Sequence, residues 1–156
     1  MNKNDLIENF GEFDYIIVGS GSAGSVMANR LSVNPKNKVL LLEAGGNDNY
    51  HWINIPIGYL YCIGNPKVDW MYNTAQEQGL GGRSISYPRG KVLGGCSSIN
   101  GMIYMRGQSR DYDLWRQLGG TGWGWDDVMP YFLKSESYHK DIPGHSQNGE
   151  MKVEKP

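Results

Sequence analysis

Residues 13–46 read FDYIIVGSGSAGSVMANRLSVNPKNKVLLLEAGG, and this stretch decides the predicted fold. Residues 13–18 are a short apolar and β-branched run, which is typical of a buried parallel strand. Residues 22–33 carry apolar side chains at helical spacing, and the following Asn34-Pro35 stops a helix. Residues 39–43 then form a second apolar run. Strand, helix and strand fit within roughly 30 residues, so the sequence predicts one βαβ unit.

The loop between the first strand and the helix has the pattern G-x-G-x-x-G, formed by Gly19, Ser20, Gly21, Ser22, Ala23 and Gly24. Such a pattern alone is a weak signal, but here a strand precedes it, a helix follows it and Glu43 closes the second strand. Gly19 would permit the tight turn, and Gly21 would let a pyrophosphate approach the backbone. Gly24 would let the helix pack on the sheet. Amides at the start of the helix would face the phosphate.

The acidic residue Glu43 stands where a dinucleotide-binding unit binds the adenosine ribose. Its carboxylate would accept hydrogen bonds from the ribose hydroxyls and disfavour a 2′-phosphate, which argues against NADP. The pattern leaves NAD and FAD open, because both cofactors use it. The alternative interpretation is a plain turn in a parallel sheet with a solvent-facing glutamate.

The composition is ordinary except for glycine. The chain has 156 residues, 39% of them hydrophobic and 20% charged, with a net charge of −1. That charge gives no reason to expect nucleic acid or an anionic membrane as partner. No apolar run approaches the roughly 18 residues that a membrane span needs. Glycine occurs 22 times, against about 11 expected from average usage. A backbone so rich in glycine suits close approach to a ligand.

The two cysteines, Cys62 and Cys96, have no secretory context that would favour a disulfide. The N-terminal residues 1–5 lack the basic region followed by an apolar region that a signal peptide needs. We therefore expect a cytoplasmic protein with reduced thiols.

A second glycine-rich segment, residues 89–107, reads RGKVLGGCSSINGMIYMRG. It has few side chains large enough to form a core of its own, so its backbone N–H groups would lie against a planar or anionic ligand. The alternative is a flexible linker. The segment is too apolar for a solvated linker, because it contains Val92, Leu93, Ile99, Met102, Ile103 and Met105.

Between the two glycine-rich segments, periodicity is weak. Residues 55–60 could form a short helix or an extended segment, and residues 70–74 alternate as a strand does. Gly79 to Arg83 is typical of a hairpin turn, with residues 84–88 as the returning strand.

Two helices are predicted after the second segment. Ser109 would cap the first, which ends at Gly119-Gly120. Asp126 or Asp127 would cap the second, which would place Pro130 in its first turn. Residues 139–150 are polar enough for a loop, and residues 151–154 begin another strand.

The second glycine-rich segment closely resembles the first signature of the glucose–methanol–choline (GMC) oxidoreductases, which are FAD-dependent. The resemblance extends over essentially the whole chain and is strongest to choline-dehydrogenase-like enzymes. Further matching motifs are LEAG at 42–45, DW at 69–70, YPRGK at 87–91, RDYD at 110–113 with Trp115, GW at 122–123 with Trp125, and PYF at 130–132. The resemblance implies an α/β fold. Residues 1–138 would form an incomplete Rossmann-like FAD-binding βαβ domain. Residues 139–156 would form a loop and the start of an antiparallel-sheet substrate domain.

The resemblance also implies which residues hold the cofactor. They are the loop Gly19, Ser20, Gly21, Ser22, Ala23 and Gly24, then Glu43, Ala44, Trp70, Arg89, Val92, Gly94, Gly95, Asn100, Gly101, Met102 and Ile103. In choline oxidases of this family, a histidine at the position of Ile99 carries the flavin covalently. Isoleucine cannot form that bond, so we expect non-covalent FAD. We expect Cys96 to be small and buried rather than catalytic.

By the same resemblance, the protein would oxidise an alcohol to an aldehyde or ketone by hydride transfer to flavin N5. The catalytic base of the family is a histidine near the C-terminus of a much longer chain, so no catalytic residue is expected here. The histidines His51, His139 and His145 would be exposed or structural, and their scatter indicates no metal site.

The expected partners are therefore an alcohol substrate and the C-terminal remainder of the enzyme, as a second chain or a missing segment. Two other functions stay open. One is a catalytically inert flavin- or nucleotide-binding module that acts as a partner subunit. The other is an NAD-dependent dehydrogenase, which the chain length and the second glycine-rich segment disfavour.

Overall fold

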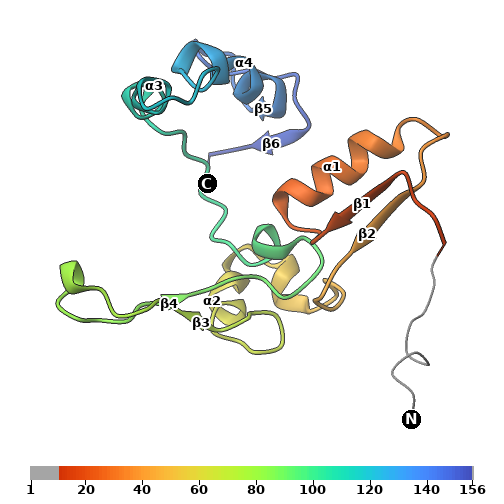
Figure 1. The fold of residues 1–156 in the computed structure, drawn as a ribbon, viewed down its shortest axis with the longest axis vertical. Coiled ribbons are helices and arrows are strands. Elements are labelled where there is room, and N and C mark those ends of the chain that lie inside the picture. Colours follow the sequence, from red (N-terminus) through yellow and green to blue (C-terminus); the bar gives the residue numbers. More distant parts are fainter. Residues whose placement is uncertain (1–10, 156) are drawn as a thin grey trace. The chain divides into compact units, whose positions relative to one another are not determined.

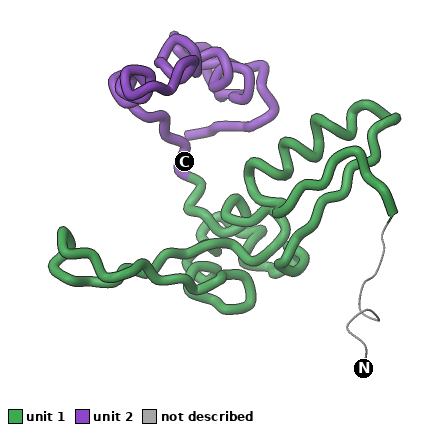
Figure 2. Tube along the Cα trace, in the orientation of Figure 1, with its two compact units in different colours: residues 1–102 green, residues 103–156 purple. Residues whose placement is uncertain are grey.

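The structure is a computed structural model that describes residues 11–155. Residues 1–5, on which the expectation of no signal peptide rests, lie outside this range. The chain forms two compact units that meet in sequence between Met102 and Ile103 (Figure 2). Within the described residues, no helix has the length and apolar character that a membrane crossing requires.

The first unit begins with strand β1 (Tyr15–Val18), helix α1 (Ser22–Ser32) and strand β2 (Val39–Leu42). The two strands are parallel, with Tyr15 opposite Val39 and Val18 opposite Leu42. Helix α1 contacts both strands and lies along them (Figure 1). The predicted order of strand, helix and strand is confirmed.

The expectation that both strands are buried is wrong: no residue of β1 or β2 is buried, and β1 is the more exposed strand. Ile16 in β1 is 60% exposed and Val18 is 83% exposed. Among the described residues, this sheet contains β1 and β2 alone, and α1 is the element that packs on them. One helix covers one face of a sheet, so the outward side chains of β1 stay in contact with solvent.

Residues 50–99 supply the apolar core of the first unit. The chain forms the 3₁₀ helices η2 (His51–Asn54) and η3 (Pro56–Gly58) and the short helix α2 (Tyr59–Cys62). Residues 56–60 are therefore helical, whereas Ile55 is extended. The core consists of Cys62, Val68, Val92 and Ile99, with Tyr50, Trp52 and Ile53 packed against it.

A hairpin extends from this core. Strands β3 (Tyr72–Asn73) and β4 (Ser86–Tyr87) are antiparallel, as predicted, but shorter than the runs of sequence that suggested them. The 3₁₀ helix η4 (Gln78–Leu80) precedes Gly81 and Gly82 at the tip, and both glycines have positive φ. The predicted hairpin turn is confirmed.

The second unit contains helices α3 (Ser109–Gln117) and α4 (Trp125–Ser135). Both predicted caps are wrong. Helix α3 is capped at Gln108, whose N–H donates to the Asp111 carboxylate at 2.9 Å. Helix α4 is capped at Gly124, whose N–H donates to Asp127 at 3.0 Å. In both helices the acidic side chain lies in the first turn and bonds back to the cap, which is the favourable place for a negative charge.

Because α4 begins at Trp125, Pro130 lies in its second turn rather than its first. A proline there leaves the carbonyl four residues earlier without its helical donor. The helix continues to Ser135 nevertheless. Tyr112 of α3 makes ring contacts with Trp125 and Phe132 of α4, which holds the two helices together.

Strands β5 (Glu136–Tyr138) and β6 (Met151–Val153) are parallel, so the expected start of an antiparallel sheet is not what this pair forms. The intervening polar loop returns the chain beside β5: the Tyr138 N–H donates to the Ser146 carbonyl at 2.7 Å. A connection of about a dozen residues is long enough for a parallel crossover. The domain boundary expected at residues 138–139 stays a prediction.

Candidate functional site

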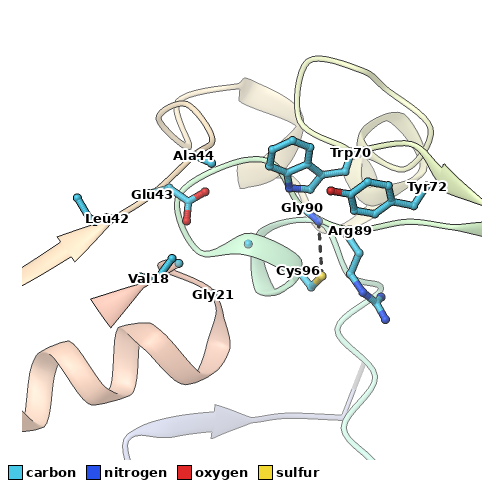
Figure 3. A pocket seen from close by; sticks show the side chains of 12 residues that line it. Val18, Gly21, Leu42, Glu43, Ala44, Trp70, Tyr72, Arg89, Gly90 and Cys96 are labelled. Atoms are coloured by element: carbon cyan, nitrogen blue, oxygen red, sulfur yellow. Dashed lines mark hydrogen bonds between the residues drawn. The ribbon is translucent and has the colours of Figure 1, made fainter. Parts of the chain in front are cut away.

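A cavity of about 540 Å³ lies in the first unit, at the carboxyl ends of β1 and β2 (Figure 3). Ligands of open α/β proteins bind at this end of parallel strands. The cavity draws residues from both strands, the glycine loop, the hairpin and the second glycine-rich segment. It is lined by Val18, Gly19, Gly21, Leu42, Glu43, Ala44, Trp70, Tyr72, Arg89, Gly90, Gly95 and Cys96.

The glycine loop has the backbone that its sequence predicts. Gly19 has φ +93°, a conformation that favours glycine, and its N–H donates to the Leu42 carbonyl at 2.7 Å. A Cβ on Gly24 would lie 1.9 Å from the Gly19 carbonyl oxygen, so this glycine is needed for close packing of helix and loop. A Cβ on Gly21 would meet nothing within 4 Å. Gly21 therefore borders open space on the cavity.

Glu43 is held by Ser20 and Gly45, and the backbone of Ala44 also donates to its carboxylate. Its Oε2 accepts the N–H and the hydroxyl of Ser20, each at 2.8 Å, and its Oε1 accepts the Gly45 N–H at 2.7 Å. The Ser20 N–H is the largest influence on the pKa of Glu43, and with the other donors it holds that pKa below the ordinary value despite partial burial. The carboxylate is therefore ionised at neutral pH.

The second glycine-rich segment lies against the glycine loop. It turns through the 3₁₀ helix η5 (Gly95–Ser98), and Gly94 and Gly95 have φ values of +87° and +56°. A Cβ on Gly95 would lie 2.9 Å from the Cα of Gly21. The Gly94 N–H donates to the Ser20 hydroxyl at 3.3 Å. The two segments are thus in backbone contact although they are far apart in sequence.

Asp69 organises the far wall of the cavity, and the sequence did not reveal this role. It is 2% exposed and accepts the N–H groups of Gly64, Met71 and Arg89 at 2.8, 3.0 and 3.0 Å. Burial acts to raise the pKa of Asp69, but these three backbone donors together lower it below the ordinary value. In the sequence, the motif Asp69-Trp70 was the available signal for this role. It places a carboxylate beside a large aromatic residue, and a carboxylate that is buried there needs hydrogen-bond donors.

The aromatic side of the cavity comes from the hairpin. The rings of Trp70 and Tyr72 are parallel within 3°, with centroids 5.8 Å apart. The Lys91 ammonium lies 4.8 Å from the centre of the Trp70 ring, and the Arg89 guanidinium lies 3.8 Å from that of Tyr87. Two cations therefore lie beside an aromatic wall at the edge of the cavity.

The structure brings only some of the predicted site residues to the cavity. Those that line it are Gly19, Gly21, Glu43, Ala44, Trp70, Arg89 and Gly95. Those beside the lining, in the same glycine-rich backbones, are Ser20, Ser22, Ala23, Gly24 and Gly94. The lining also includes Tyr72 and Gly90, which sequence reasoning missed; both lie in segments that it had recognised as strand and motif.

Val92 was expected to line the site, but its side chain is fully buried in the core. Ile99 is in the same core and is 3% exposed. Cys96 is only partly buried, contrary to expectation, and it lines the cavity; its sulfur accepts the Gly90 N–H at 3.5 Å. Leu93 and Met102 of the same segment are apolar but not buried, so apolar character alone did not identify the buried residues.

Asn100, Gly101 and Met102 end the first unit outside the cavity lining. Gly101 faces the Tyr59 ring, which a Cβ would approach at 3.7 Å. Met102 has φ +55°, and its N–H donates to the Asn100 side-chain oxygen at 2.9 Å. Ile103 belongs to the second unit.

The histidines lie away from the cavity lining. His51 and His139 are exposed, and His145 bonds through Nδ1 to Glu136 in the second unit. Glu136 is fully buried and also pairs with Arg106, which in turn donates to the Gly144 carbonyl at 2.7 Å. This buried group ties β5 to the following loop, so the role of His145 is structural.

Parallel strands, a glycine loop at the start of a helix and a cavity at the strand ends define an α/β protein of the nucleotide-binding class. The family model described as GMC oxidoreductase matches residues 13–156. The chain belongs to the GMC oxidoreductase family.

Relatives of known name agree with this assignment. An oxygen-dependent choline dehydrogenase from Photobacterium profundum is 49% identical over 81% of the chain and 22% of its own length. An alcohol dehydrogenase [acceptor] from Pseudomonas putida is 46% identical over 90% of the chain and 26% of its own length. The crystal structure of pyridoxine 4-oxidase from Mesorbium loti superposes with a TM-score of 0.82 and 37% identity, over 90% of the chain and 28% of that enzyme. The chain thus spans about a quarter of the length of these relatives.

Proposed function

We propose that this chain forms the adenosine- and flavin-facing part of the FAD site in an alcohol-oxidising flavoenzyme. The observation that carries the proposal is the meeting of both glycine-rich segments around one cavity at the carboxyl ends of β1 and β2. A dinucleotide loop alone would serve NAD equally well. The second segment, the aromatic wall and family membership together favour FAD.

The residues present suit FAD. The open space at Gly21 admits a pyrophosphate beside the first turn of α1, where unpaired N–H groups and the positive end of the helix favour an anion. Glu43 is ionised, which suits ribose hydroxyls and repels a 2′-phosphate. Trp70 and Arg89 would contact the cofactor from the opposite wall. We assign Asn100 to Ile103 to the flavin ring, on the resemblance of this stretch to the family signature.

FAD, when bound, supplies the acceptor for a hydride from the carbon of an alcohol that becomes an aldehyde or ketone. The residues of this chain bind and orient the cofactor. Relatives are named for choline, alcohol and pyridoxine, so the substrate class we propose is an alcohol. The base that removes the hydroxyl proton would come from outside this chain.

We further propose that β1–α1–β2 is the start of a Rossmann-like sheet completed by a C-terminal remainder. The exposed side chains of β1 and the quarter-length coverage of relatives support this. Non-covalent FAD is supported by Ile99, whose buried hydrocarbon side chain cannot form a bond to flavin. Free thiols at Cys62 and Cys96 support a reducing, cytoplasmic location.

The test is an absorbance spectrum of the purified protein, followed by denaturation. We expect flavin bands at about 370 and 450 nm and release of intact FAD into the supernatant. A colourless protein that nicotinamide dinucleotide protects against unfolding would contradict the FAD assignment, and flavin retained on the polypeptide would contradict non-covalent binding.

An inert flavin-binding module remains the competing function, since no histidine is among the described residues that line the cavity. Co-expression with a C-terminal remainder and anaerobic addition of alcohols separates the two. Bleaching of the flavin by an alcohol supports an enzyme, whereas a flavin that no alcohol reduces supports the inert module.

A further inference from the structure

Trp70 is the aromatic residue of the cavity whose backbone is held from both sides. Its own N–H donates to the Arg89 carbonyl at 2.8 Å. The residues before and after it are joined to each other, because the Met71 N–H donates to Asp69 Oδ1 at 3.0 Å. The same oxygen accepts the Arg89 N–H, also at 3.0 Å. Asp69 Oδ1 therefore bonds both the residue that follows Trp70 and the segment that lies beside it.

Asp69 is connected in turn to the core of the first unit. It is 2% exposed and follows Val68, which belongs to that core. Its Oδ2 accepts the Gly64 N–H at 2.8 Å, and its own N–H donates to the Asn65 carbonyl at 2.8 Å. Asp69 is not among the described residues that line the cavity, so its carboxylate lies behind the wall that Trp70 helps to form.

The bond to Met71 supports a backbone conformation that methionine rarely adopts. Met71 has φ +58°, in the left-handed region, and an Asx side chain two residues earlier stabilises such a turn. This turn lies between Trp70 and Tyr72, whose rings are parallel within 3° and both line the cavity (Figure 3). A different conformation at Met71 would turn one of these rings away from the other.

We propose that Asp69 is a positioning residue that holds the Trp70 ring in the place where it contacts the bound cofactor. The inference rests on the proposed FAD site and adds a residue that acts on the cofactor through its neighbour. Trp70 is 37% exposed, so part of its ring is free to meet a ligand. A contact that is fixed before binding costs less conformational entropy when the ligand arrives.

The first experiment is a double-mutant cycle on FAD binding by the full chain, followed through the quenching of flavin fluorescence. Asp69→Asn keeps an oxygen for Met71 and Arg89 but makes it a neutral acceptor. We expect the Kd for FAD to rise about fivefold. In the Trp70→Ala background, the same substitution should change Kd by less than about twofold, because the ring that Asp69 positions is gone.

The second measurement needs no cofactor. The parallel rings of Trp70 and Tyr72 should contribute to near-ultraviolet circular dichroism, and Trp70→Ala identifies that contribution. We expect Asp69→Asn to reduce it. Asp14→Asn is the matched control, because the Asp14 carboxylate also accepts a backbone N–H, that of Lys38 at 2.8 Å, in the same unit. Asp14 is not among the described residues that line the cavity, so both Kd and the signal should stay unchanged.

Each outcome decides for or against this role. A loss of affinity that disappears in Trp70→Ala, together with a reduced near-ultraviolet signal, supports the proposal. Equal losses in both backgrounds, or a signal that Asp69→Asn leaves unchanged, overturn it while leaving the FAD site intact. If the unaltered chain binds no FAD, the proposed function fails. The near-ultraviolet signal then still tests whether Asp69 positions Trp70, and it also decides if Trp70→Ala binds FAD too weakly for the cycle.

Discussion

The two glycine-rich segments of the first unit reach the same cavity by different means. Residues 19–24 are one turn between a strand and a helix, and local geometry accounts for them. Residues 89–102 contain one short 3₁₀ helix and are held mainly by contacts with distant residues. Lys91 donates to the Val68 carbonyl at 2.7 Å, and Leu93 donates to the Gly46 carbonyl at 2.8 Å. Glycine permits the backbone conformations of both segments. Only the conformation of residues 19–24 follows from the local sequence.

The two segments also use glycine for two purposes. Gly24 and Gly90 allow close packing: a Cβ would lie 1.9 Å from the Gly19 oxygen at the first and 2.1 Å from the Gly95 oxygen at the second. Gly19 and Gly21, both in the first segment, have no atom within 4 Å of a Cβ position. Packing glycines fix the wall of the cavity, whereas open glycines leave space beside it.

The largest effects should come from the packing glycines. We expect Gly24→Ala and Gly90→Ala each to lower the free energy of unfolding by about 3 kcal/mol, because the new methyl group meets backbone that cannot move aside. Gly21→Ala is the matched control. Gly21 has φ −68°, which alanine adopts freely, so it should lose less than about 1 kcal/mol as a helix cap.

Denaturant unfolding of the three variants measures these losses. Gly21→Ala should weaken FAD binding the most although it is the most stable of the three variants. Its methyl group lies where the pyrophosphate would lie. If Gly21→Ala binds FAD normally, this glycine does not border the cofactor. If Gly24→Ala unfolds like the unaltered protein, the close packing of helix and loop is not needed.

The next effect concerns Asp69, which accepts the N–H of Arg89 at the start of the second segment and the N–H groups of Gly64 and Met71. We expect Asp69→Ala to cost about 2–3 kcal/mol, since three buried N–H groups lose a charged acceptor. Asp69→Asn keeps one acceptor oxygen but turns an amide group towards a donor, so a smaller loss is expected. Denaturant unfolding at neutral pH provides the measurement.

The pH dependence of stability follows from the same residue. The pKa of Asp69 is lower in the folded protein than in the unfolded chain, so the folded state binds fewer protons and ionised Asp69 stabilises it. This contribution is complete above the unfolded pKa of about 4 and is lost as the pH falls through the lower folded value. In Asp69→Asn, the free energy of unfolding should depend less on pH below a pH of about 4. An equally steep curve in the variant would assign the acid sensitivity to other carboxylates.

The contrast between the segments explains which predictions from sequence succeeded. The βαβ unit and the hairpin β3–β4 follow from short-range patterns of apolar residues and glycine, so the sequence predicts them. The role of Asp69 does not follow, because its three donors lie five positions before it, two positions after it and 20 positions after it. The bond between Ser20 and Gly94 spans 74 positions and leaves no local pattern.

The second unit shows the same difference between what local sequence patterns predict and what they do not. Helices α3 and α4 follow from apolar spacing, but their first residues depend on which acidic group bonds back to the cap. The direction of β6 depends on how the loop after Tyr138 returns, which composition does not encode. Periodicity therefore predicts that an element exists, whereas its ends and its neighbours are decided by particular hydrogen bonds.

The smallest effect concerns the end of the second segment, where Met102 takes a left-handed conformation at φ +55°. The Asn100 side chain accepts the Met102 N–H at 2.9 Å, and Asp69 accepts that of Met71, at φ +58°, in the same way. Both methionines thus follow an Asx side chain two residues earlier, which supports a turn that methionine alone disfavours.

We expect Asn100→Ala to cost about 1 kcal/mol of unfolding free energy, through loss of this bond and of support for the turn. Met102→Gly should restore part of that loss in the double variant, because glycine adopts positive φ without a side-chain acceptor. Asn100→Asp keeps the acceptor and should stay near the unaltered stability. A double-mutant cycle by denaturant unfolding measures the coupling. If Asn100→Ala costs the same with methionine or glycine at position 102, Asn100 does not support this backbone, and the second segment depends on its distant contacts alone.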